Sequence, residues 1–438
     1  MPSIRFISTA ISFIALYQQI RSVVASSLQD DPVTTCSSYD LSNKNFPGRG
    51  TAIEDDGTCK VTMPGNRDAP HRKLEVIEGS DTAKLEEYFG VKLETKLKNL
   101  PTSAIHHPSP WNGPSWLVYQ DSINYEWKKG QLSPAEKDAT AFGLNVTEFM
   151  DKVSAQNGID SEMNYSTPCT TDNDCDFTTC AIRKNAISGY CIPTWYDISH
   201  AWAPASVLEK GPVCAVNFNG VVFHPIDVMG LVTDIYDGVK VSTIFTGSRY
   251  NGGNESMDAY GRSVEYSYRD VNPGFFHIAA TNLLGKLNHT FIIDRYAGYV
   301  VWNQPVYVFE VYEQTSMTVE EAAQIFYDSN TYPWNDNATS IVHVTANLLW
   351  NNDVDADVRD SILVMNSDPS ATYEYLLELN KAEEIIGGEW LNKANDNHPD
   401  FIWFPKGKPA ADVVTSVGLS YANVTMLLEM AAACSYSK

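Results

Sequence analysis

Apolar and polar residues alternate with a helical period in the first part of the chain. Four apolar residues between positions 85 and 93 recur every three or four residues, which predicts a helix with one buried face: Leu85, Tyr88, Phe89 and Leu93. A second helix is expected after Ser133, because Pro134 suits a first helical turn and Glu136 completes a capping box. Between them, the Pro- and Trp-rich segment 103–124 is expected to be a loop packed on a core.

Aromatic and β-branched residues predict strands later in the chain. FFHIAATNLL (275–284) and HTFIID (289–294) are expected to form a hairpin around the turn GKLN. ATYEYLLEL (371–379) and FIWF (401–404) are further predicted strands, and Tyr421–Ala433 is a predicted final helix. Because helices and strands do not alternate regularly, the sequence predicts an α+β fold and not a doubly wound sheet.

Composition divides the 438 residues into consecutive regions. We expect a signal peptide at 1–26, a flexible extension at 27–70, a helical domain at 71–165, a catalytic core at 166–345 and a C-terminal α/β region at 346–438. Residues 1–26 have Arg5, an apolar run and small residues before Ser26, and that run is too short to span a bilayer. We therefore expect a secreted protein with no membrane span.

The formal net charge is -23, with 31 Lys and Arg against 54 Asp and Glu. An acidic chain without a basic block argues against nucleic acid as a partner. Six N-x-[ST] sequons are consistent with surface glycans in a secreted protein: Asn145, Asn164, Asn254, Asn288, Asn337 and Asn423.

The eight cysteines all follow the predicted signal peptide, and an even number in an oxidising compartment indicates disulfides. Cys169, Cys175, Cys180 and Cys191 are spaced too widely for zinc, so a two-disulfide staple with three open connectivities is expected. The other expected pairs are Cys36 with Cys59 and Cys214 with Cys434.

A nucleophile, a base and an orienting acid occur in the order found in papain-like enzymes: Ser199, His277 and Asp294. A helix is expected to begin near Ala203, so Ser199 would lie near a helix N-terminus that stabilises negative charge. In the predicted hairpin His277 and Asp294 lie opposite each other, within hydrogen-bonding reach. Two structural alternatives remain open: Ser199 as a helix cap, and His277 and Asp294 as a structural pair or on different faces.

The segment VWNQPVYVFEVYEQTSM (301–317) resembles the elicitor peptide of the oomycete transglutaminase elicitor family. HAWAP (200–204), YDG (236–238), PGFFHIA (273–279), GGEW (387–390), HPDF (398–401) and GKPAADVVTSVGLSYA (407–422) also resemble that family. Within 301–317, the residues Trp302, Asn303, Gln304 and Pro305 match the family peptide, whereas Tyr307, Val308 and Glu310 depart from it. Pro305 suggests an edge or exposed strand.

The resemblance implies a papain-like core and a secreted, calcium-dependent transglutaminase that joins protein glutamine and lysine side chains. It also implies a host plant receptor as a partner for the elicitor-like segment 301–317. His277 and Asp294 match the base and the orienting acid, and the family has Cys where this chain has Ser199. A Cys there would leave one free thiol among four disulfides. Cys214 is a less favoured substitute, because it lies in a Gly/Pro loop.

Three functions stay open. The first is an aminoacyltransferase, active or nearly inactive. The second is a pseudoenzyme that acts as a binding, surface or host-recognised protein, and the third is a papain-like or serine hydrolase. For calcium, Asp353, Asp355 and Asp357 alternate as oxygen ligands do, and so do Asp172, Asp174 and Asp176. A solvated acidic turn is the alternative for both sets.

Overall fold

The computed structural model describes residues 80–250, 256–298, 300–351 and 369–433. The predicted signal peptide, the extension 27–70, the sequon at Asn254 and the candidate ligands Asp353, Asp355 and Asp357 lie outside the described residues. So do Cys36, Cys59 and Cys434. In the part of the chain that is described, no helix is both long enough and apolar enough to cross a membrane.

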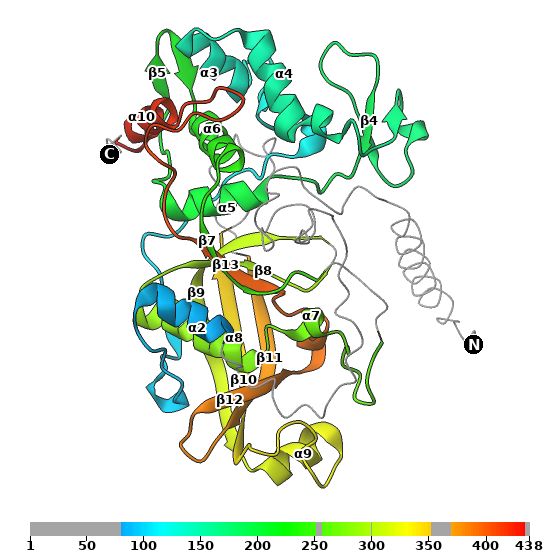
Figure 1. Ribbon diagram of the computed structural model, residues 1–438, viewed down its shortest axis with the longest axis vertical. Helices are drawn as coiled ribbons and strands as arrows, with labels where there is room; N and C mark the ends of the chain where they lie inside the picture. The colour runs from blue at the N-terminus through cyan, green and yellow to red at the C-terminus, as the bar shows by residue number, and fades with distance from the viewer. Residues whose placement is uncertain (1–79, 251–255, 299, 352–368, 434–438) are drawn as a thin grey trace, which may run out of the picture.

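Helices and strands are mixed along the described chain (Figure 1). The α-helices are α2 (Ser80–Phe89), α3 (Pro134–Phe142), α4 (Val146–Asn157), α5 (Ser199–Leu208), α6 (Pro225–Gly238), α7 (Tyr266–Arg269), α8 (Pro273–Ala280), α9 (Val319–Tyr327) and α10 (Tyr421–Ala432). The strands are β1 (Ser103–Ile105), β2 (Pro168–Cys169), β3 (Thr179–Ala181), β4 (Gly189–Ile192), β5 (Val216–Phe218), β6 (Val221–Phe223), β7 (Thr243–Gly247), β8 (Phe291–Asp294), β9 (Asn303–Met317), β10 (Ser340–Trp350), β11 (Ser370–Leu379), β12 (Ile385–Trp390) and β13 (Phe401–Pro405). Short 3-10 helices occupy Leu97–Asn99, Val118–Gln120, Ser122–Asn124, Ile159–Glu162, Asp172–Asp174 and Asn392–Asn395, and a π-helix, η7, spans Thr281–Lys286.

One large antiparallel sheet organises the fold. Its strand order is β12-β11-β10-β9-β8-β13-β7, and β1 pairs with β9 outside this path. The expected boundary between residues 345 and 346 falls inside β10, and strands from both expected regions pair in the same sheet. The strands on either side of that boundary are therefore packed as one unit.

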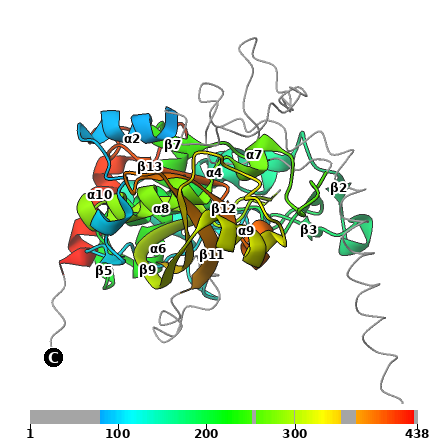
Figure 2. The ribbon, with the colours of Figure 1, turned by 90° about the horizontal axis from the view of Figure 1, so that it is seen from below.

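The sheet separates two hydrophobic cores. Along β8, Ile292 belongs to the core beneath α3, α4, α5, α6 and α10, whereas Ile293 faces the core that contains α8. Along β13, Trp403 faces the first core and Phe404 the second, as expected for side chains that alternate between the faces of a strand. Figure 1 shows α5 and α6 above the sheet and α2 and α8 beside it, and Figure 2 gives the view from below.

Predictions that depend on local sequence are confirmed for two helices and two strands. Ser133 and Glu136 form the predicted capping box at the start of α3. The predicted strands 371–379 and 401–404 correspond to β11 and β13, and the predicted final helix corresponds to α10.

The predicted hairpin is wrong in its first strand. Residues 275–284 continue a helix, α8, that begins after the cap Asn272 with Pro273 in its first turn and runs into η7. Every residue of α8 is buried. A helix that is apolar on all sides has no polar face, so its periodicity does not distinguish it from a buried strand.

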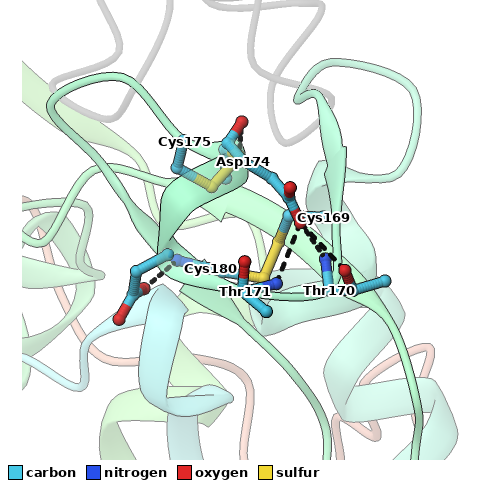
Figure 3. Close-up of a disulfide and its surroundings, with 8 residues drawn as sticks. Cys169, Thr170, Thr171, Asp174, Cys175 and Cys180 are labelled. Carbon is cyan, nitrogen blue, oxygen red and sulfur yellow. Dashed lines mark hydrogen bonds between the residues drawn. A yellow bond between two sulfur atoms is a disulfide. The ribbon is translucent and has the colours of Figure 1, made fainter.

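The predicted disulfide staple is confirmed. Cys169 bonds Cys180 (Figure 3) and Cys175 bonds Cys191, so all four cysteines pair among themselves. Cys214 is also disulfide-bonded. The sulfurs of Cys169, Cys175 and Cys191 lie close together, but each one is in a disulfide and so none is a thiolate ligand for a metal.

Candidate functional site

Ser199 is the first residue of α5 and is 4% exposed. The helix begins four residues earlier than predicted, because the N–H groups of Ala201 and Trp202 both donate to the carbonyl oxygen of Ile198 and so form a turn before Pro204. The backbone N–H of Ser199 donates to Asp197 Oδ1 at 3.0 Å. Ser199 therefore lies at a helix N-terminus, where the helix dipole stabilises negative charge.

The side chain of Ser199 faces the start of β9. Asn303 Nδ2 lies 3.4 Å from Ser199 Oγ, and Asn303 Oδ1 accepts a hydrogen bond from Trp403 Nε1 at 2.9 Å. The indole N–H fixes which end of the Asn303 amide points at Ser199. Three elements, α5, β9 and β13, thus fix one polar contact between buried side chains.

The elicitor-like segment supplies this contact, and its predicted edge position is wrong. β9 lies between β8 and β10, and Asn303, Gln304 and Pro305 are buried. Trp302 is half-buried, and its backbone N–H donates to Asp294 Oδ1 at 3.0 Å. The exposed part of the segment is residues 312–316, at the opposite end of the strand.

Asp294 ends β8 and pairs in register with Asn303 on β9, so both side chains point to the same face of the sheet. It is fully buried, and Asp294 Oδ2 has no hydrogen-bond partner among the described residues. Burial raises the pKa of Asp294 to about 7, against the lowering effect of the Trp302 N–H and of Arg249. Asp294 therefore lies beside the contact between Ser199 and Asn303.

Asp400 precedes β13 at the same edge of the sheet and adds a second buried carboxyl group. Its pKa is raised well above the usual range, first by burial and then by the negative charges of Asp294 and Asp270. Its Oδ2 accepts the N–H of Tyr250 at 2.9 Å. Two neighbouring buried carboxyl groups are difficult to ionise together, so this edge is able to retain a proton near neutral pH.

His277 lies elsewhere. It is on α8, in contact with the second core, where its Nδ1 lies 2.8 Å from the Tyr375 hydroxyl and its ring packs edge-on against Phe309. Burial alone lowers its pKa to about 3, and no carboxylate is among the causes. Among the described residues, neither Ser199 nor Asp294 hydrogen-bonds to His277, so the three predicted residues do not form a hydrogen-bonded triad in this structure.

His200 is a buried residue of the site whose role the sequence reasoning missed. Its Nε2 lies 2.9 Å from Asp237 Oδ1, and both side chains are at most 3% exposed. Asp237 Oδ2 accepts hydrogen bonds from Gln156 Nε2 and Asn157 Nδ2. The signal was present, because HAWAP contains His200 and YDG contains Asp237. The pair anchors the first turn of α5 to α6.

In the disulfide staple, the carboxylates of Asp172 and Asp174 already accept hydrogen bonds from backbone N–H groups. Asp174 Oδ2 accepts the N–H groups of Thr170 and Thr171 (Figure 3). Asp172 Oδ1 accepts the N–H of Cys180. The backbone donors lower the pKa of Asp174. These carboxylates act as turn caps, so the acidic-turn interpretation fits them better than a calcium site.

Comparisons with known proteins agree with the resemblance. Residues 81–434 match the family model described as transglutaminase elicitor. The chain is similar to the crystal structure of the GP42 transglutaminase from Phytophthora sojae, with 52% sequence identity and a TM-score of 0.73, over 81% of this chain and 98% of that chain. No curated protein matches the chain. The matched range contains every site residue described above.

Proposed function

The chain belongs to the transglutaminase elicitor family, and we propose that its reaction site is the contact between the α5 N-terminus and the edge of the sheet at Ser199, Asn303 and Asp294. The observation that carries the proposal is the 3.4 Å contact between Asn303 Nδ2 and Ser199 Oγ at a helix start. A nucleophile at a helix N-terminus facing antiparallel strands is the arrangement of a papain-like core. Protein side chains are the substrates that the family implies.

The proposed reaction is acyl transfer from a protein glutamine to a lysine amine. The nucleophile attacks the glutamine carboxamide, ammonia leaves, and the lysine amine displaces the nucleophile from the acyl-enzyme. A donor such as Asn303 Nδ2, held by Trp403, is suited to stabilise the oxyanion that forms in each step. Burial keeps Asp294 close to protonation near pH 7, which suits a group that exchanges a proton with the leaving ammonia.

Ser199 limits this chemistry. A Cys at a helix N-terminus is stabilised as a thiolate, whereas a Ser must lose its proton as it attacks. Loss of the nucleophile of an intact site costs on the order of a million-fold in rate. We therefore propose that the chain as it stands is a weak or inactive transferase, and the alternative is a pseudoenzyme that binds proteins without reaction.

An amine-incorporation assay on a glutamine-rich protein tests the proposal. The chain is compared with Ser199→Cys, with Ser199→Ala as the matched control, in the presence of calcium. We expect Ser199→Cys to incorporate amine several orders of magnitude faster than the other two, because only it supplies a thiolate. A folded Ser199→Cys protein with a titratable free thiol and no incorporation would favour the pseudoenzyme.

We also propose that the protein is a secreted glycoprotein. The sequon asparagines Asn145, Asn164, Asn288 and Asn337 are exposed, as glycosylation requires, and Asn423 is half-buried. The described disulfides suit an oxidising compartment. Mass spectrometry of the protein from secreting cells, before and after enzymatic removal of N-glycans, tests this. An unchanged mass contradicts it.

Recognition of the elicitor-like segment by a host plant receptor is proposed only for its exposed part. Residues 312–316 are exposed, whereas Trp302 and Asn303 contribute to the reaction site. A partner that binds the folded protein is therefore expected to contact 312–316. Substitution of Tyr312, which is 60% exposed, should weaken binding to a plant membrane preparation without changing the Tm. Unchanged binding by the variant contradicts this placement.

A further inference from the structure

An arginine without a charged partner lies beside the proposed reaction site. Arg295 directly follows β8, which ends at Asp294, and its side chain is half-buried. No ion pair in the part of the chain that is described includes Arg295, and its Nε is buried without a hydrogen-bond partner there. Charged groups that leave water are normally paired, so this guanidinium is a candidate to bind an anion.

Two aromatic rings hold the guanidinium in place. Arg295 Cζ lies 5.1 Å from the centre of the Trp302 ring and 5.3 Å from the centre of the Tyr296 ring. Trp302 Nε1 donates to the Tyr296 hydroxyl at 3.2 Å, and the Tyr373 hydroxyl donates to the backbone oxygen of Arg295 at 3.2 Å. Cation–π contacts fix a guanidinium without using its terminal N–H groups, which therefore stay available for hydrogen bonds.

Contacts connect Arg295 to the proposed nucleophile. Trp302 directly precedes Asn303, whose Nδ2 lies 3.4 Å from Ser199 Oγ. The backbone N–H of Trp302 donates to Asp294 Oδ1 at 3.0 Å. The positive charge of Arg295 is close enough to lower the pKa of Asp294, although burial raises that pKa to about 7 in the end. Asp294 is therefore only partly ionised at neutral pH and does not fully neutralise the arginine.

The chemistry of the guanidinium indicates its ligand. The planar set of N–H donors matches the two oxygens of a carboxylate, and this charge-assisted bond is stronger than one between neutral groups. Protein substrates carry carboxylates on Glu and Asp. The chain has 54 Asp and Glu against 31 Lys and Arg, so its overall charge repels an acidic substrate. A local positive charge at the site is therefore needed to admit one.

We propose that Arg295, held between Tyr296 and Trp302, binds a carboxylate of the protein that donates the acyl group. The reaction site would then prefer a glutamine that has Glu or Asp next to it. We call these three residues the carboxylate site. The preference during acyl transfer rests on the proposed function, whereas binding of the carboxylate does not.

Peptide binding to the unmodified chain tests the proposal without catalysis. The probe is a labelled peptide with the chain's own sequence 311–317, VYEQTSM, which has Glu313 directly before Gln314. Its ends are blocked, so the glutamate is its carboxylate. In fluorescence anisotropy, we expect the chain and its Ser199→Ala variant to bind this peptide about 10- to 100-fold more tightly than peptides with Glu313→Ala or Glu313→Lys. The difference should shrink as NaCl is added.

Substitution of the arginine locates the binding. Arg295→Gln should remove the preference for the glutamate peptide, and Arg295→Lys should keep part of it, because lysine keeps the charge but not the planar donors. Lys381→Gln is the control, since it removes a positive charge from an exposed position between β11 and β12. In the Ser199→Cys background, Arg295→Gln should raise KM for the glutamate peptide with little change in kcat, as expected for a group that only binds substrate.

The outcomes separate the carboxylate site from the proposed function. Selective binding by the unmodified chain, without amine incorporation by Ser199→Cys, would support the carboxylate site and contradict the reaction. Equal binding of the three peptides, no binding of the glutamate peptide, or unchanged selectivity in folded Arg295→Gln would overturn the carboxylate site. If Arg295→Gln does not fold, the three peptides and their salt dependence on the unmodified chain still decide.

Discussion

His200 Nε2 lies 2.9 Å from Asp237 Oδ1 in the interior, and this pair joins the first turn of α5 to the end of α6. The residue before His200 is the proposed nucleophile. The position of Ser199 Oγ relative to Asn303 therefore depends on a carboxylate 38 residues further along the chain.

Substitution of that carboxylate should affect the reaction more than substrate binding. In the Ser199→Cys background, Asp237→Asn is expected to lower kcat by about 10- to 100-fold with a small change in KM, because displacement of the nucleophile by about 1 Å can cost that much. Steady-state amine incorporation measures both constants. Glu374→Gln is the control for loss of a His–carboxylate pair, since Glu374 lies 2.9 Å from His343 on β10 and β11 at a more exposed position. An equal loss in the control would contradict the argument.

Asn303 should be required for the same step. In the Ser199→Cys background, Asn303→Ala removes the donor at Ser199 and leaves the Trp403 indole N–H without its acceptor. Loss of a single oxyanion donor costs about 10²- to 10³-fold in kcat. Asn347→Ala on β10 is the control for a truncated buried asparagine, because Asn347 is 6% exposed and bonds Thr372. The proposed role fails if both variants retain the same activity.

His277 should control acid stability. The folded-state pKa of His277 is lowered to about 3 by burial, against an ordinary value of 6.5. As the pH falls below 6.5, the unfolded chain takes up a proton at this histidine that the folded chain does not. The free energy of unfolding should therefore fall between about pH 6.5 and 3, by on the order of 5 kcal/mol in all. Urea unfolding at several pH values should show a flatter profile for His277→Gln.

The same variant separates the two interpretations of His277. A glutamine side chain can still bond the Tyr375 hydroxyl, so the fold is expected to persist. If His277 is structural, Ser199→Cys with His277→Gln should keep amine-incorporation activity per folded molecule. A loss of several orders of magnitude in a folded protein would restore the interpretation of His277 as the base.

A side chain at Gly274 should lower the stability of the fold. A Cβ added there would lie 2.7 Å from the carbonyl oxygen of Gly387, so α8 and β12 approach each other through two glycines. Gly274→Ala is expected to cost about 1–3 kcal/mol of unfolding free energy, measured by urea unfolding. Gly407→Ala, with no atom within 4 Å of the added Cβ, is expected to cost little, and equal costs would contradict the close approach.

The sequence predicts elements that depend on neighbouring residues, but it does not predict elements and contacts that depend on tertiary packing. The capping box at Ser133 and the disulfide staple depend on residues close in sequence, and both predictions are confirmed. The helix α8 has no polar face, so its apolar run predicts a strand as readily as a helix, and the predicted strand wrongly puts His277 opposite Asp294. The two residues of the Ser199–Asn303 contact are 104 positions apart in the sequence. Their contact depends on the position of β9 in the sheet, which the pattern of apolar and polar residues does not encode.

The strand β13 comes almost last in the chain, yet it lies between β7 and β8. During synthesis, neither β7 nor β8 can therefore complete its pairing with β13 until residues 401–405 have left the ribosome, and Trp403 cannot hold Asn303 before then. The nascent protein would have no assembled reaction site until synthesis is nearly complete. Pairing of β13 between β7 and β8 is therefore the late event on which the position of Asn303 relative to Ser199 depends.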